Sequence, residues 1–371
     1  MSAGKRRWLL LGALACVLIV IGFFYFSSRR FTEEIKREEK LLLAMGIDVR
    51  PVAKADDAQL DYQQIADAII ANAKSPPPVE ITLQLLEEAG KKPAVGFDEA
   101  RLTATKRSAR AARPFNVISR WMLDLEIKAA KKHDWKILDR LFAIDMRMRT
   151  QFLAGENDVS GTITVANGLP PMFALTHEDA RVRKWLRGKY EAFDIGTMVR
   201  AKFTGIGRRA RRFDGDPAFG KSEAKPLLRQ MAEDQDSFRA MADLAVLREY
   251  RKIVEATLKL TPNDALASAT VIQLRTALGN LKSEPARWAG VRVRGWTGAY
   301  ILLRQRNALL VELDIRDSIE QKKPLVLTWS KRYCVDPFTN EPLKLTVMKD
   351  GVHLTQTRLS MNDMWDHTIF F

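Results

Sequence analysis

An uninterrupted apolar segment near the amino terminus constrains this chain more than any other feature. Residues 8–26 read WLLLGALACVLIVIGFFYF and contain no charged side chain. As a helix rising about 1.5 Å per residue, the segment spans roughly the 30 Å hydrocarbon core of a bilayer. Trp8 and Tyr25 lie near its two ends, where aromatic rings prefer the headgroup level. The sequence therefore predicts a single transmembrane anchor over residues 1–30.

Two other interpretations of this segment are a cleaved signal peptide and a lipoprotein signal. The apolar core of a signal peptide usually runs about 7–15 residues and ends at a site of small residues. Here the apolar run is longer, and residues 27–30 (SSRR) offer a poor cleavage site. Residues 13–16 (ALAC) would supply a lipidated cysteine, but the apolar run continues past Cys16 instead of stopping there. A retained anchor is the favoured interpretation.

The flanking charges predict the orientation of this anchor. Lys5, Arg6 and Arg7 precede the apolar segment, whereas Arg29 and Arg30 follow it and are soon joined by several glutamates. The positive-inside rule then favours a cytoplasmic amino terminus and an exported body.

The rest of the chain is predicted to be mainly α-helical, in an irregular bundle or array. Residues 31–57 are expected to form a solvated helical stalk and linker, with a break at Gly46. Residues 58–298 are expected to form a helical domain, in which apolar residues recur three and four positions apart. The clearest pattern lies on both sides of a His133-Asp134 turn and predicts an antiparallel helical hairpin. Further helices are expected at 60–73, 81–89, 160–175, 178–193, 223–260 and 263–281.

The carboxy-terminal region, residues 299–371, changes character. A final amphipathic helix is expected over residues 299–321. Three β-prone runs follow at 325–329, 343–348 and 352–357, separated by turn sequences. We expect a small antiparallel β meander, followed by a polar, solvated tail.

Two basic stretches stand out in a chain whose net charge is +15. The first contains Lys106, Arg107 and Arg110, and the second contains Arg208, Arg209, Arg211 and Arg212. These residues are candidates for binding an anionic lipid or wall polymer, although such runs are usually solvated surface. Nucleic acid is the less favoured partner, because few aromatic residues are interleaved and no recognition motif is present.

Motifs for catalysis, cofactors or metals are weak. Ser222 and Lys225 match a Ser-x-x-Lys pattern, but its companion motifs are absent, and Ser222 is expected to cap a helix. Gly205 and Gly207 lack the third glycine of a dinucleotide loop. Asp363 and His367 could share a helical face and bind an ion, but a solvated tail is the favoured interpretation. We therefore predict no catalytic, cofactor-binding or metal-binding residue.

The carboxy-terminal sequence resembles one known tail. Residues 336–343 (DPFTNEPL), 350–354 (DGVHL) and 360–363 (SMND) are similar to the tail of major pseudopilins of type II secretion, which recurs in membrane-anchored helical proteins of bacteria. Asn362 replaces the glycine of the final loop, and the prepilin cleavage motif is absent. The resemblance implies a bacterial envelope protein whose last strands form a small sheet, without assembly into a pilus.

These observations favour a single-pass protein of the bacterial inner membrane with an extracytoplasmic body. That body is expected to act as a non-catalytic interaction or scaffolding module with protein partners in the envelope. One alternative is an envelope enzyme acting on wall polymer or lipid, which a buried carboxylate pair in a cleft would favour. The other is a membrane-tethered binder of nucleic acid or anionic lipid.

Overall fold

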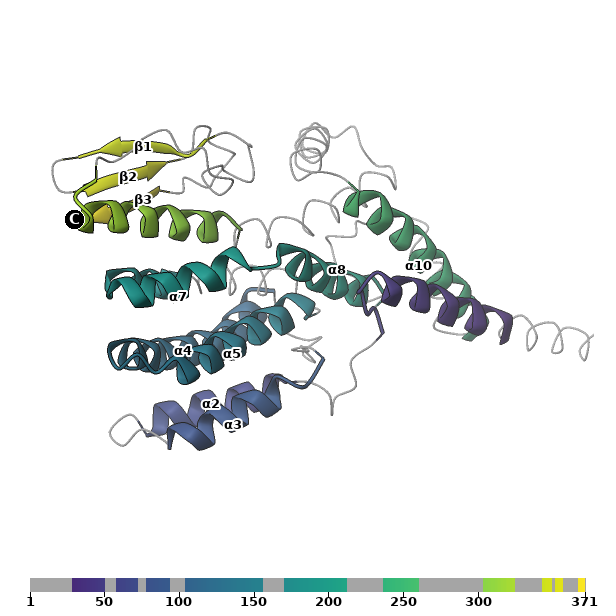
Figure 1. Ribbon diagram of the computed structural model, residues 1–371. Coiled ribbons are helices and arrows are strands. Elements are labelled where there is room, and N and C mark those ends of the chain that lie inside the picture. The colour runs from purple at the N-terminus through teal and green to yellow at the C-terminus, as the bar shows by residue number, and fades with distance from the viewer. Residues whose placement is uncertain are drawn as a thin grey trace, which may run out of the picture. The chain divides into compact units, whose positions relative to one another are not determined.

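The computed structural model describes the parts of the chain that carry most of the predicted helices. The described residues are 29–50, 58–72, 78–93, 104–155, 170–211, 236–259, 303–323, 342–348, 351–355 and 366–370. They are mainly helical, with a small antiparallel sheet near the carboxy terminus, as the sequence predicts (Figure 1). None of the described helices is both long and apolar enough to cross a membrane. Residues 1–28 of the predicted anchor lie outside the described part of the chain.

The elements follow one another along the chain in a simple order. They are a helix at 29–44, α2 (Gln59–Ala71), α3 (Val79–Ala89), α4 (Ala104–Lys131), α5 (Trp135–Ala154), the 3-10 helix η2 (Pro170–His177), α7 (Ala180–Glu191), α8 (Ile195–Arg211), α10 (Asp236–Leu258), a helix at 303–320, and strands β1 (Lys344–Val347), β2 (Gly351–Thr355) and β3 (Asp366–Phe370).

The chain divides into two compact units whose limits differ from the predicted domains. One unit combines Met1–Arg50 with Gly207–Ala256, and the other combines Pro51–Ile206 with Thr257–Phe371. The predicted helical domain, 58–298, is thus shared between the two units, and the division falls inside α8. Sequence periodicity identifies helices but carries no information on which helices pack together, so it could not place this division.

In the first unit, helix 29–44 packs against α10 and is not a free-standing stalk. Glu38 is only 7% exposed, and the guanidinium of Arg251 in α10 donates to its carboxylate over 2.6 Å. Arg248 of α10 forms an ion pair with Glu34, which lies one helical turn before Glu38. The expected solvated face is therefore partly an interface. The helix ends at residue 44, and the positive φ of 77° at Gly46 confirms the predicted break.

In the second unit, the predicted hairpin around His133 and Asp134 is confirmed as α4 and α5. His133 adopts a left-handed conformation with φ of 52°, and the Asp134 side chain caps α5 by accepting from the backbone N–H of Ile137. The predicted apolar faces are buried between the helices, for example at Met122 and Leu141. A connection this short forces α4 and α5 to run antiparallel.

The α2–α3 hairpin, α7 and α8 all contact the α4–α5 hairpin. The α2–α3 hairpin contacts α4 and α5, where Arg140 of α5 pairs with Glu80 and Glu87 of α3. On α7, Trp185 donates its indole N–H over 2.7 Å to Asp139 of α5. Gly205 of α8 lies so close to α5 that an added Cβ would be 2.4 Å from a backbone oxygen. Glycine is required at this crossing because no side chain fits.

The sheet has the order β1-β2-β3, and both pairs are antiparallel. Strands β1 and β2 confirm two of the predicted β runs. Strand β3 corrects the expectation of a solvated tail, because Asp366–Phe370 pairs along the whole length of β2. His367 is consequently in a strand, opposite Leu354, and not on a helix. The helical spacing proposed for Asp363 and His367 is wrong at His367, and Asp363 lies outside the described residues.

Several other predictions also fall outside the described residues. They are the Ser222 cap, the helix at 263–281, the strand at 325–329 and most of the segment 160–175, of which only the 3-10 helix η2 is described. The helices expected at 60–73, 81–89, 178–193 and 299–321 are confirmed as α2, α3, α7 and the helix at 303–320, with ends shifted by a few residues.

Candidate functional site

The predicted basic residues occupy the ends of two helices in different units. Lys106, Arg107 and Arg110 lie in the first turns of α4, and Arg208, Arg209 and Arg211 lie in the last turns of α8. Arg212 lies outside the described residues, as do the side chains of the others except Arg208.

Arg208 lies inside the first unit rather than on its surface. Its side chain is almost fully buried, donates over 3.1 Å to the carbonyl of Arg50, and lies 3.5 Å from the carboxylate of Asp48. A guanidinium held in this way stabilises the turn after helix 29–44 and does not face a ligand. The proposed role in binding an anionic surface is thus corrected for Arg208 and stays a prediction for the other six residues.

A cluster of ionisable side chains is buried between α4, α5 and α7. Arg149 donates to both oxygens of Asp145, one turn earlier on α5, over 2.7 and 2.9 Å. Its guanidinium carbon lies 5.5 Å from the ring centroid of Phe115, in the range of a cation–π contact. Glu126 of α4 and Tyr190 of α7 complete the group, and none of the ionisable members is more than 2% exposed.

Burial dominates the electrostatics of this cluster. Desolvation and the nearby Asp145 carboxylate raise the pKa of Glu126 well above its ordinary value, while Arg149 opposes this shift. Burial likewise raises the pKa of Tyr190. Burial therefore favours the neutral form of the Glu126 carboxyl, and Asp145 and Arg149 form the charged pair of the cluster. The cluster is close to electroneutral, and this makes its burial tolerable.

The geometry of this cluster does not provide a catalytic site. A general acid or base must reach the proton it transfers, either directly or through one water molecule. Glu126 and Asp145 form the carboxylate pair that an enzyme would need, but both side chains are buried between the helices that carry them and their neighbours. A shallow hollow of about 230 Å³ lies elsewhere, between α3 and α5, and is lined by Glu87, Arg140 and Arg147.

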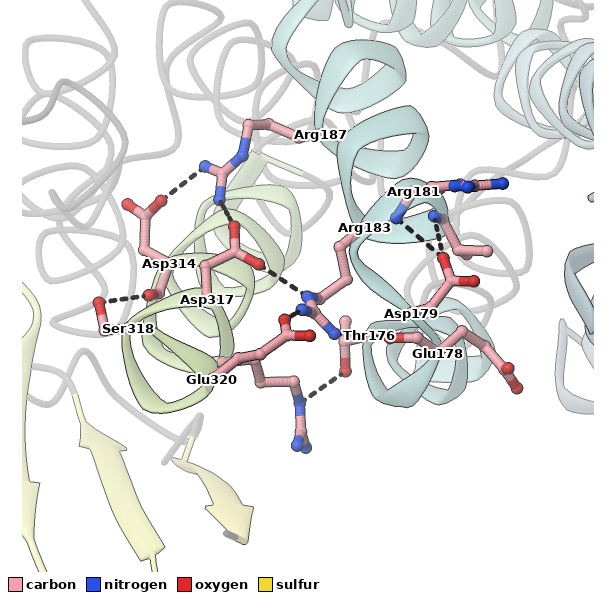
Figure 2. A network of polar contacts seen from close by, with 12 residues as sticks. Thr176, Glu178, Asp179, Arg181, Arg183, Arg187, Asp314, Asp317, Ser318 and Glu320 are labelled. Atoms are coloured by element: carbon pink, nitrogen blue, oxygen red, sulfur yellow. Dashed lines mark hydrogen bonds and ion pairs between the residues drawn. The ribbon is translucent and has the colours of Figure 1, made fainter. Parts of the chain in front are cut away.

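A second polar network joins α7 to helix 303–320 (Figure 2). Arg183 donates over 2.7 Å to Asp317, and it also contacts Glu320 and the carbonyl of Glu178. Arg187 reaches Asp314 over 2.6 Å and shares Asp317. These two arginines of α7 thus share three acids of the other helix. The network connects two segments that lie more than 120 residues apart in the sequence. Its charged side chains pair with one another and stabilise the packing of α7 against helix 303–320.

The outer face of the α2–α3 hairpin is the candidate interaction surface. Helices α2 and α3 carry half of the large apolar side chains that are exposed in the described part of the chain: Leu60, Ile70, Val79, Ile81 and Leu85. Val79 lies one helical turn before the buried Leu83 and on the same side of α3, so the outer face is formed by the other four. Ile81 and Leu85 are 55% and 51% exposed, although both are on a helix whose other side is packed. Concentrations of exposed apolar surface commonly mark binding sites for other proteins.

The helix geometry explains why this face points away from the body. Tyr62 in α2 and Leu83 in α3 are fully buried toward α4 and α5. Leu60 and Ile81 each precede one of them by two positions, or about 200° around a helix. They therefore emerge on the opposite side, where the described residues of the second unit place no further layer (Figure 1).

Sequence reasoning missed both the buried cluster and the outer face of α2–α3. The i, i+4 spacing of Asp145 and Arg149 was a signal for the ion pair, but Glu126 and Tyr190 come from other helices. On α3, leucine and isoleucine occupy several sides of one helix, which is the sequence signal for apolar side chains outside the packed side. No histidine, cysteine, aspartate and glutamate group suited to a metal ion occurs within the described ranges.

Comparison with known proteins adds no family to this description. No protein-family model, curated protein or solved structure matches the chain.

Proposed function

We propose that this chain is a single-pass, membrane-anchored interaction protein of the bacterial cell envelope, with an exported, non-catalytic helical body. The observation that carries the proposal is the apolar outer face of the α2–α3 hairpin. A surface helix normally turns its apolar stripe inward and its polar face to water. A hairpin that exposes aliphatic side chains at the end of a stack of helices is suited to being covered by another protein.

The anchor is supported by the sequence. The apolar run ends at residue 26, and the first described helix begins at residue 29 with the exposed Arg29 and Arg30. Cations directly after an apolar segment suit the headgroup region of a bilayer. The first unit would then stand next to the membrane, because helix 29–44 belongs to it.

A non-catalytic role is supported by where the polar groups lie. The pKa values of Glu126 and Tyr190 are raised strongly, as in many catalytic sites, but these side chains are closed to substrate. Arg183 and Arg187 are occupied by the acids of helix 303–320. These groups contribute to stability and to the specificity of packing.

Two measurements on the full-length chain test the proposal. A reporter that is active only outside the cytoplasm, fused after Phe371, should give signal, and a cytoplasmic reporter should not. A photo-reactive amino acid at Leu85 should form a discrete protein adduct in intact cells, whereas the same group at Lys128, an exposed position on α4, should not. Signal from the cytoplasmic reporter would overturn the orientation. Absence of an adduct at Leu85 would overturn the interaction role.

A further inference from the structure

We infer that the outer face of the α2–α3 hairpin binds the same face of a second copy of this chain. The inference rests on the proposed interaction function and names the partner. The charge of the hairpin, the size of its face and the membrane anchor proposed above favour a second copy.

The charge of the hairpin differs from that of the chain as a whole. Helices α2 and α3 contain no lysine or arginine and carry five acids, which are Asp61, Asp67, Glu80, Glu87 and Glu88. The whole chain carries a net charge of +15, so two copies repel each other over most approaches. At the hairpin, whose two helices carry no basic residue, the repulsion between two copies is weaker.

Each of these acids is already paired within its own copy. Arg140 binds Glu80 and Glu87 over 2.7 and 2.6 Å, and Lys92 lies 2.6 Å from Asp61. Lys91 pairs with Glu88, and Arg113 lies 3.9 Å from Asp67. Two such faces therefore present nearly balanced charge to each other, and their apolar side chains can meet without placing an unpaired acid against an acid.

The size of the face indicates that the contact between two copies depends on the membrane anchor. Helices of 13 and 11 residues are about 20 and 16 Å long. Side by side, with axes about 10 Å apart, they offer roughly 400 Å² per copy. A stable complex in solution usually buries about 800 Å² per partner. A face of this size binds weakly in solution but suffices for partners already held in one membrane, where tethering raises the effective concentration. A second copy shares that anchor by definition.

Cysteine cross-linking of the full-length chain in its membrane tests the inference. In a Cys16→Ser/Cys334→Ser background, Leu85→Cys should form a covalent dimer with a short bifunctional thiol reagent, at twice the 42.1 kDa mass of the chain. Adding Ile81→Glu should reduce the dimer about tenfold, because a charge would be desolvated at the apolar contact. Lys128→Cys is the matched control and should stay monomeric. Both Leu85 and Ile81 are more than half exposed, so these variants should retain the wild-type helical circular dichroism.

The outcomes separate the inference from the proposed function. A dimer at position 85 that Ile81→Glu removes supports a second copy. No dimer, together with a photo-adduct at Leu85 of a different protein, overturns the second copy and leaves the interaction role intact. No dimer and no photo-adduct overturns both. A dimer that forms equally from Lys128→Cys would show random collision in the membrane and would also overturn the inference.

Discussion

Replacing Arg149 with methionine should destabilise the packing of α4, α5 and α7 by about 3–5 kcal/mol, the usual cost of removing one partner of a buried ion pair. The variant keeps a long side chain of similar reach, so little cavity is created. What it removes is the guanidinium that donates to Asp145 through hydrogen bonds of 2.7 and 2.9 Å, in a site that is 1% exposed. The loss is therefore electrostatic, because a carboxylate is left buried without its counter-charge.

A double variant isolates this cause. Asp145→Asn/Arg149→Met contains neither charge, and it should recover most of the stability lost in the single variant. A loss of 3–5 kcal/mol corresponds to a fall in Tm of roughly 6–20 °C for a domain of this size. The cation–π contact between Arg149 and Phe115 is also lost in both variants, and it accounts for about 1 kcal/mol that the double variant should not recover.

Thermal unfolding of the purified full-length chain in detergent, followed by circular dichroism at 222 nm, measures both effects. The single variant should unfold earlier than wild type, and the double variant should lie between them and closer to wild type. If the single variant loses less than about 1 kcal/mol, the site is better solvated than its burial indicates. If the double variant is as unstable as the single variant, packing and not charge is responsible, and the reasoning fails.

Three further predictions concern other parts of the second unit. Because the pKa of Glu126 is raised in the folded state, the folded chain holds a proton that the unfolded chain loses above pH 4.5, so stability falls as the pH rises. Glu126→Gln should remove this loss, and denaturant titrations should show a gain of about 1–3 kcal/mol that is larger at pH 8 than at pH 5. Arg183→Ala should speed hydrogen exchange in helix 303–320 but not in α2, since its two acidic partners lie on that helix. Gly205→Ala should cost about 1–3 kcal/mol by steric clash, whereas Gly188→Ala, with no atom within 4 Å of the added Cβ, should be neutral or gain up to about 1 kcal/mol in the same unfolding assay.

The local structure of this chain could be predicted from the sequence wherever a signal is contained in one element. The α4–α5 hairpin follows from apolar spacing and a short turn, and Gly46 and Gly90 mark helix ends as expected. Strand β3 was missed because residues 366–370 (DHTIF) are short and begin with polar residues. Its pairing partner, β2, is what makes it a strand, and the sequence of a single segment does not contain that information.

Packing between distant segments could not be predicted in the same way. Glu38 looks like part of a solvated charge run, because acids and bases alternate around it. Its burial depends on Arg251, which lies more than 200 residues later and fixes helix 29–44 against α10. Arg208 was expected on the surface for the same reason, since its partners Asp48 and Arg50 are far away in the sequence. A charged residue is classed as surface by default, and only tertiary contacts reveal the exceptions.

The buried carboxylates show that suitable residues alone do not make a catalytic site. Glu126 and Asp145 have the composition of a catalytic pair, and the pKa of Glu126 is raised as a general acid requires. The deciding property is access, because Asp145 is fixed by Arg149 and both acids lie under packed helices. An opening of α4 wide enough to admit a substrate would break the ion pair and the contact with Phe115 together. The same interactions that make this cluster stable therefore oppose its use in catalysis, and the exposed side chains of α2 and α3 are better placed to carry the function.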